Sequence, residues 1–183
     1  MTRIVIVNGM PETGKTTVQE LCREILKGIG WNCIIESSVD WVKEIARYAG
    51  WNGEKTDCNR KFLSDLKRAL TDWDDSVLKH LVSVVDSYHY TGDDHVIFID
   101  IREPAEIEKA KLAFNASTLL VRRPQVEDNK YSNTSDMDVF NYDYDYTIWN
   151  NDGLMSLRGE CGRFLSKLLL DNVHIYKDEE SYS

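Results

Sequence analysis

Two glycines, a lysine and a threonine near the start of the chain constrain its fold more than any other feature. Gly9 and Gly14 are separated by four residues, and Lys15 and Thr16 follow directly, which gives the spacing G-x-x-x-x-G-K-[ST]. The apolar run over residues 3–8 ends where this segment begins, and such runs are typical of strands buried on both faces. Because the glycines permit a tight turn whose amides point inward, the segment predicts a phosphate-binding loop (P-loop) between a strand and a helix.

The helix predicted after the P-loop completes a site for a nucleoside triphosphate. Apolar side chains recur at helical spacing over residues 16–27, and Gly28 and Gly30 supply a stop. The amino terminus of this helix adds the positive end of its dipole to the loop amides. We expect Lys15 to reach the β and γ phosphates and Thr16 to ligate Mg²⁺. The residues predicted to bind the nucleotide here are Gly9, Pro11, Glu12, Thr13, Gly14, Lys15, Thr16 and Thr17.

Strand and helix patterns alternate along the rest of the chain. Apolar runs predict strands over residues 33–36, 95–100, 117–121 and 146–149. Helical periodicity predicts helices over residues 39–49, 59–70, 74–90, 104–114 and 154–170. This alternation predicts a three-layer α/β fold of the P-loop type, with a five-stranded parallel sheet and helices on both of its faces.

Length and charge narrow the class of function. A chain of 183 residues suits a single domain over residues 1–183. A net charge of −9 opposes binding to DNA or RNA, because that binding depends on clustered Lys and Arg. No stretch is apolar enough to span a membrane, the chain start lacks a signal-peptide pattern, and the four cysteines form no C-x-x-C pair. We expect a cytoplasmic protein, monomer or homodimer, that acts on a small-molecule nucleotide.

A carboxylate for Mg²⁺ is predicted at the end of the third strand. Asp100 closes the apolar run over residues 95–100, and an acid in that position typically reaches Mg²⁺ directly or through water. The alternative is an aspartate that caps the turn ahead of Pro104. We assign the metal site to Thr16 and Asp100.

Arginines at predicted strand ends are candidates for stabilising a transferred phosphoryl group. The planar guanidinium binds two phosphoryl oxygens at once, and Arg60, Arg102, Arg122 and Arg123 are the four candidates. Any one of them could instead be a solvated surface residue. Arg102 and Arg123 follow the carboxyl ends of strands, where ligands bind in open α/β sheets, so we expect them to be catalytic together with Lys15.

The end of the second predicted strand is the expected acceptor side. Glu36, Ser38 and Asp40 lie there and are candidates to bind the acceptor. A carboxylate would suit an acceptor hydroxyl, whose proton must be removed, whereas an acceptor phosphate needs cations. The alternative role for Ser38 is to cap the following helix.

Four tryptophans could stack on a nucleobase, but the sequence assigns that role to none of them. Aromatic side chains of this kind are more often part of a core, so no base stack is assigned. This applies to Trp41, Trp51, Trp73 and Trp149.

Three segments resemble known nucleotide kinases. The segment from Tyr144 to Leu157, with sequence YDYTIWNNDGLMSL, resembles the late strand and turn of guanylate kinases and dephospho-coenzyme A kinases. By that resemblance, Asn150 or Asn151 contacts the adenine of the donor. Two further segments are similar to the bacteriophage-type deoxynucleoside monophosphate kinases: DIREPAEI from Asp100 to Ile107 with the arginine pair Arg122 and Arg123, and WVKEIA from Trp41 to Ala46 followed by Lys55, Arg60 and Leu63.

The resemblance to the P-loop nucleoside and deoxynucleoside monophosphate kinases, with their adenylate and guanylate kinase-like fold, carries several expectations. It implies ATP with Mg²⁺ as donor, a deoxynucleoside monophosphate as acceptor, and Arg60 plus Arg102 or Arg123 on phosphates. An insertion at about residues 50–90 would cover the acceptor, and a lid-like segment at about residues 122–141 would close over the donor to exclude water. Residues 125–141 are few and contain no arginine, which departs from the pattern of the family.

Two other functions stay open from the sequence. One is a P-loop kinase for a hydroxyl acceptor, such as a nucleoside, with Glu36 or Asp40 as base. The other is a regulatory protein that binds ATP or GTP and hydrolyses it slowly. The chain has no N-K-x-D segment of the kind that specifies guanine, which argues against the second.

Overall fold

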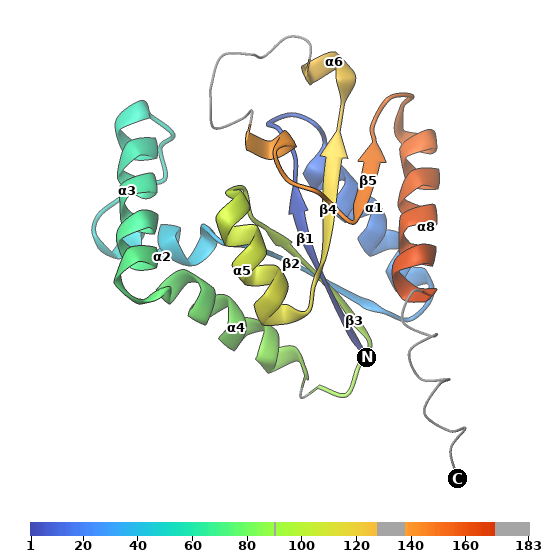
Figure 1. Cartoon of the computed structure of the whole chain (residues 1–183), viewed down its shortest axis with the longest axis horizontal. Helices are drawn as coiled ribbons and strands as arrows, with labels where there is room; N and C mark the ends of the chain where they lie inside the picture. Colours follow the sequence, from blue (N-terminus) through green and yellow to red (C-terminus); the bar gives the residue numbers. More distant parts are fainter. Residues whose placement is uncertain (90, 128–137, 171–183) are drawn as a thin grey trace.

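A parallel sheet forms the centre of the molecule, as the sequence predicts (Figure 1). The computed structural model describes residues 1–89, 91–127 and 138–170, and within them the sheet has five strands. They are β1 (Thr2–Asn8), β2 (Asn32–Ser37), β3 (His95–Asp100), β4 (Ser117–Arg122) and β5 (Tyr146–Trp149), in the spatial order β2-β3-β1-β4-β5. Every pairing is parallel, so the carboxyl ends of all the strands meet at one edge.

The register of the sheet brings distant residues together at that edge. Val7 of β1 lies opposite Asp100 of β3 on one side and Leu119 of β4 on the other. Arg122 of β4 lies opposite Trp149 of β5. The P-loop, which follows β1 at the centre of the order, therefore lies between the ends of β3 and β4.

Helices cover both faces of the sheet and create two cores. One core lies under α1 (Lys15–Gly28) and α8 (Leu154–Leu170), and the other under α4 (Ser76–His89) and α5 (Pro104–Phe114). Alternate residues of β1 enter alternate cores: Val5 and Val7 the first, Ile4 and Ile6 the second. This burial on both faces explains why the strands are continuous apolar runs in the sequence.

The predicted insertion contains one helix at the side of the molecule and one that packs on a face of the sheet. After α2 (Asp40–Tyr48), the chain forms α3 (Asp57–Asp74), which Figure 1 shows at the side of the molecule, and then α4. Thr56 caps α3, because its side-chain oxygen accepts a hydrogen bond from the amide of Asn59 at 3.2 Å. The helix is longer than the predicted range 59–70, and it ends only where Asp75 adopts a left-handed conformation with φ of 55°.

The lid-like segment is only partly described. α6 (Pro124–Glu127) begins it and the 3₁₀ helix η1 (Asp138–Phe140) follows its middle part. Residues 128–137 lie outside the described residues, so the predicted closure over the donor stays a prediction. In the part of the chain that the structure covers, no helix combines the length and hydrophobicity needed to cross a membrane.

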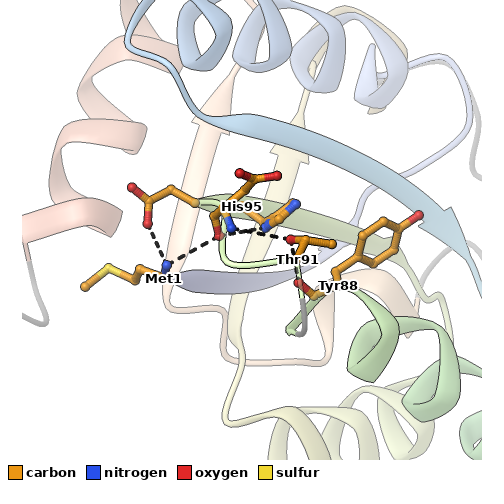
Figure 2. A network of polar contacts seen from close by, with 6 residues as sticks. Met1, Tyr88, Thr91 and His95 are labelled. Carbon is orange, nitrogen blue, oxygen red and sulfur yellow. Dashed lines mark hydrogen bonds and ion pairs between the residues drawn. The ribbon is translucent and has the colours of Figure 1, made fainter.

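The amino-terminal edge of the sheet is tied together by a polar network (Figure 2). The terminal ammonium of Met1 lies 2.5 Å from the carboxylate of Asp94, and the carbonyl of Met1 accepts a hydrogen bond from the amide of His95 at 2.8 Å. Thr91 donates to the carbonyl of Tyr88 at 3.0 Å, and the rings of Tyr88 and His95 are 5.7 Å apart. These contacts fix the start of β1 to the start of β3.

Candidate functional site

The P-loop lies between β1 and α1 and requires glycine at two positions. Gly9 has φ of 153° and Gly14 has φ of 95°, which side chains disfavour. A Cβ atom on Gly9 would lie 2.5 Å from the carbonyl oxygen of Val121, and one on Gly14 would lie 2.6 Å from the amide nitrogen of Asn150. The two glycines therefore allow close packing of the loop against the ends of β4 and β5.

Hydrogen bonds within the P-loop hold it in shape. The hydroxyl of Thr13 donates to the carbonyl of Met10 at 2.9 Å, and Thr13 is 1% exposed. The ammonium of Lys15 lies over the loop and donates to the carbonyls of Gly9 and Met10 at 2.5 and 3.0 Å. The lysine is therefore already within the loop that it is predicted to serve.

Asn8 joins the P-loop to the ends of two neighbouring segments, a role that the sequence analysis missed. Its amide nitrogen donates to the carbonyl of Arg102 at 3.0 Å and to the hydroxyl of Tyr144 at 2.8 Å, while its amide oxygen accepts from the backbone of Gly9 at 2.8 Å. Burial raises the pKa of Tyr144 to about 12, so this hydroxyl stays protonated. The available signal was a polar residue that ends an apolar strand directly before the loop.

Asp100 lies next to the P-loop, where the sequence places it. Gln19, on the first turns of α1 and 1% exposed, donates to one carboxylate oxygen of Asp100 at 2.7 Å. Burial raises the pKa of Asp100, and the hydrogen bond from Gln19 and the charges of Lys15 and Arg102 act in the opposite direction. Gln19 was not predicted, because a buried glutamine on a helix has no distinctive sequence pattern.

The predicted Mg²⁺ ligands suit the ion chemically. Mg²⁺ in triphosphate sites takes one or two protein oxygens and completes its shell with water and phosphate oxygens. Asp100 offers a carboxylate beside Lys15, and Thr16 offers an exposed hydroxyl at the first turn of α1. The described residues contain no group of three or more His, Cys, Asp or Glu side chains that could hold a metal by themselves. Asp100 and Thr16 suit an ion whose remaining ligands are water and phosphate oxygens.

A cavity of about 390 Å³ adjoins the P-loop at the carboxyl edge of the sheet. Its walls come from the ends of β1, β2 and β3, the start of α2, and α3. The polar and charged side chains that line it are Asn8, Lys15, Ser37, Ser38, Lys43, Arg60, Ser64, Lys67, Asp100, Arg102 and Glu103. Five of these are cations and two are carboxylates, so the cavity favours an anionic ligand.

The cavity cations differ in how they are paired. Lys43 lies 2.7 Å from Asp40, whereas Arg60 has only Asp57 at 3.9 Å and its side chain is 70% exposed. Among the described residues, no hydrogen bond or ion pair holds the guanidinium of Arg102, although its charge acts on the carboxylate of Asp100. Arg60 and Arg102 are therefore the cations best able to accept a new anionic partner.

Lys67 forms a buried cluster at the far wall of the cavity, which the sequence analysis also missed. Its ammonium lies 2.9 Å from Glu103 and 2.6 Å from Glu106, and its side chain is 10% exposed. Burial tends to raise the pKa of Glu103, but Lys67 outweighs it and holds that pKa below its ordinary value. For Glu106 burial is the larger influence, and its pKa is raised. The cluster fixes α3 of the insertion to the start of α5.

The predicted acceptor residues at the end of β2 divide into two groups. Ser38 is buried and lines the cavity. Glu36 and Asp40 do not line it, and Asp40 is paired with Lys43. Burial, with the nearby charge of Asp40, raises the pKa of Glu36. Ser38 does not cap α2, whose amino-terminal position is taken by Val39 without a side-chain bond.

The arginine pair after β4 lies away from this cavity. Arg122 binds the buried carboxylate of Glu127, with its nearest contact at 2.5 Å, and its guanidinium is stacked between two rings, 4.8 Å from Phe140 and 4.5 Å from Trp149. Arg123 is exposed, and its backbone amide donates to Glu127 at 3.1 Å. Neither lines the cavity, so a phosphate contact from Arg123 stays a prediction.

Asn150 and Asn151 follow β5 beside the P-loop. The side-chain amide of Asn150 donates to the carbonyl of Thr13 at 3.0 Å, and its backbone amide donates to Arg122 at 2.8 Å. Asn151 is exposed, and its carbonyl accepts a hydrogen bond from Gln125 at 3.4 Å. Asn150 thus has a role in holding the loop, and the adenine contact that the resemblance implies stays a prediction for both residues.

Comparisons with known proteins define the class of fold. No protein-family model matches the chain, and a search of curated proteins found no similar sequence. Solved structures do match. APS kinase from Mycobacterium tuberculosis is 14% identical with a TM-score of 0.53, and the match covers 90% of this chain and 98% of the other. Shikimate kinase from Acinetobacter baumannii is 16% identical with a TM-score of 0.52 and 93% of each chain covered, and thymidylate kinase from Ehrlichia chaffeensis is 12% identical with a TM-score of 0.51, covering 90% of this chain and 98% of the other. The chain therefore has the fold of the P-loop kinases, over nearly its whole length.

Proposed function

We propose that this protein transfers the γ-phosphoryl group of ATP, with Mg²⁺, to a nucleoside or deoxynucleoside monophosphate. One observation carries the acceptor assignment: Arg60 and Arg102 line a cavity that Lys15 of the P-loop also lines. The carboxylate of Asp57 lies 3.9 Å from Arg60, at the limit of an ion pair. The donor assignment rests on the P-loop, and it agrees with the APS kinase structure, which contains AMPPNP.

The P-loop side would hold the donor. Loop amides and the amino terminus of α1 favour binding of the β and γ phosphates. The ammonium of Lys15 would exchange its hydrogen bonds to the carbonyls of Gly9 and Met10 for contacts with these phosphates. Thr16 and Asp100 would hold Mg²⁺, which supplies charge neutralisation at the phosphates when it is bound. Gln19 orients the carboxylate of Asp100.

The cavity side would hold the acceptor phosphate. Arg102 and Arg60 would bind the oxygens of this phosphate, and the hydroxyl of Ser38 would donate a hydrogen bond to one of them. In the transfer, an acceptor phosphate oxygen forms a bond to the γ phosphorus while the bond to the leaving oxygen of ADP breaks. The attacking oxygen is already anionic, so no base is needed, and Lys15 and Arg102 stabilise the charge that spreads over the moving group.

A hydroxyl acceptor is the main rival. Shikimate kinase and a sugar kinase from Janibacter are among the matching structures, so the fold permits it. A hydroxyl acceptor calls for a base, and neither Glu36 nor Asp40 lines the cavity. The cation excess of the cavity also suits a phosphate better than an uncharged sugar. These two observations favour the monophosphate.

An acceptor panel tests the proposal. ADP release from ATP and Mg²⁺ is measured with each ribo- and deoxynucleoside monophosphate, with free nucleosides, and with no acceptor. We expect turnover that depends on one or a few monophosphates. Dependence on nucleosides alone would establish the rival, and slow turnover unaffected by any acceptor would indicate a regulatory nucleotide-binding protein.

A matched pair of variants links that turnover to the cavity. Arg60→Ala removes a cation that lines the cavity, and Lys61→Ala removes its neighbour on α3, which pairs with Asp65 and does not line it. We expect the KM for the acceptor to rise about tenfold in Arg60→Ala and to stay unchanged in Lys61→Ala. Equal changes in KM in the two variants would show that Arg60 does not bind the acceptor.

A further inference from the structure

Three side chains form a stack at the end of β5. Phe140, Arg122 and Trp149 lie in that order, with the guanidinium of Arg122 4.8 Å from the first ring and 4.5 Å from the second. Glu127 holds the guanidinium in place through bonds to two of its nitrogens. Trp149 is nevertheless 41% exposed, so part of the indole that ends the stack is open.

Trp149 directly precedes Asn150, which contacts the P-loop. The next residue, Asn150, donates its side-chain amide to the carbonyl of Thr13 at 3.0 Å, and a Cβ atom on Gly14 would lie 2.6 Å from the same amide nitrogen. The backbone of Asn150 is fixed to Arg122 at 2.8 Å. The tryptophan is therefore held at a constant position relative to the loop that binds phosphate.

We infer that Trp149 is the platform on which the base of the donor nucleotide stacks, and that stacking rather than reading of the base edge holds the base. The inference rests on the donor half of the proposed function. Arg122 covers one face of the indole, and the base occupies the side left open. Asn150 positions the loop instead of reading the base, because its amide is turned to the backbone of Thr13.

Stacking has a consequence for donor choice. Every nucleobase has an aromatic face, so a stacking platform tolerates different bases, and purines gain more than pyrimidines because their faces are larger. The protein therefore accepts ATP and GTP with similar affinity. Loss of one base stack weakens affinity by about 5- to 150-fold.

The test is a set of binding measurements that need no acceptor. Dissociation constants for ATP, GTP and tripolyphosphate, each with Mg²⁺, are measured by calorimetry for the wild type and for Trp149→Ala, Trp149→Phe and Trp73→Ala. Trp73 is a matched control, because it is 77% exposed on α3 and does not line the cavity. Tripolyphosphate reports on the P-loop alone, since it has no base.

We expect Trp149→Ala to weaken ATP and GTP about tenfold or more while tripolyphosphate changes less than twofold. Trp149→Phe should retain most of the affinity, and Trp73→Ala all of it. Unchanged ATP affinity in Trp149→Ala, an equal loss of tripolyphosphate, or a wild-type preference between ATP and GTP above tenfold would overturn the inference. A failed acceptor panel with these binding results intact would reject the proposed transfer and leave the platform standing.

Discussion

The P-loop and the cavity that adjoins it are neighbours, yet their polar groups are organised in opposite ways. In the loop the polar groups are bonded to one another: Lys15 to the carbonyls of Gly9 and Met10, and Thr13 to Met10. In the cavity Arg60 and Arg102 are long side chains whose ends lie largely in the open. The backbone shapes the first site, and side chains that a ligand must still order shape the second.

This difference predicts how each site responds to change. Because the loop is already ordered, ordering it costs little free energy when a nucleotide binds. Substitutions in the loop should therefore weaken the stabilisation of charge on the moving phosphoryl group and lower kcat. Flexible cavity cations lose rotamer freedom when an acceptor binds, so changes there should act strongly on the KM for the acceptor.

Lys15→Ala should have the largest effect. It removes the cation expected at the β and γ phosphates, so kcat should fall about 10³-fold or more. Lys27→Ala, at the exposed end of the same helix, is the matched control and should keep full activity. Steady-state kinetics with saturating ATP decide the matter, and a Lys15→Ala enzyme with normal kcat would remove the loop from the chemistry.

Arg102→Ala comes next, with a fall in kcat/KM of about 10²-fold, because it removes a cation from both the acceptor phosphate and the transferred group. Arg102→Lys should recover only part of this loss, since an ammonium cannot bind two oxygens in a plane. Arg68→Ala, an exposed arginine on α3 paired with Asp65, is the control. Equal losses in both alanine variants would show that general surface charge, not the cavity, is responsible.

Lys67→Met should affect stability and the acceptor together. It leaves two carboxylates unpaired beside a buried position, and because Glu103 is 56% exposed we expect a loss of about 2 kcal/mol rather than the larger cost of a fully buried pair. Urea unfolding measures this loss. The double variant Lys67→Met, Glu106→Gln should recover part of it, and no recovery would mean that packing, not charge, accounts for the effect.

Asp145→Asn should have the smallest effect and should leave both sites alone. Burial tends to raise the pKa of Asp145, but hydrogen bonds from Lys111 and Thr118 outweigh it and hold the pKa below its ordinary value. A lowered carboxylate pKa adds stability at neutral pH that is lost as pH falls through the acidic range. The wild type should therefore exceed the variant by about 1 kcal/mol or less at pH 7, with the gap closing toward pH 3 and kcat unchanged. A gap that grows on acidification would contradict the assignment.

The strands and the P-loop could be predicted because local sequence determines them. The predicted run 95–100 coincides with β3, and Pro104 begins α5 as expected at a first helical position. The range of α3 was underestimated, because the polar residues at both of its ends give little periodic signal. The order of the strands was not predicted, since it depends on pairings between residues far apart in the chain.

Site residues could be predicted where local sequence determines them and not where distant residues do. Asp100 could be placed beside Lys15 because it follows a recognisable buried strand. Asn8, Gln19 and Lys67 could not, because their partners lie 94, 81 and 36 residues away in the sequence. Trp149 was expected in a core, yet it is exposed, whereas Ile148 beside it on the same strand is buried.

The identity of the reaction product shows whether a phosphoryl group is transferred to the phosphate of the acceptor. The chain is incubated with ATP, Mg²⁺ and each acceptor that raises turnover, and the products are separated by chromatography and examined by ³¹P NMR. We expect a nucleoside diphosphate of the acceptor, in which the new phosphorus is coupled to the original one, and none of it with Lys15→Ala. A new phosphate monoester on a hydroxyl, or inorganic phosphate alone, would rule out transfer to a monophosphate.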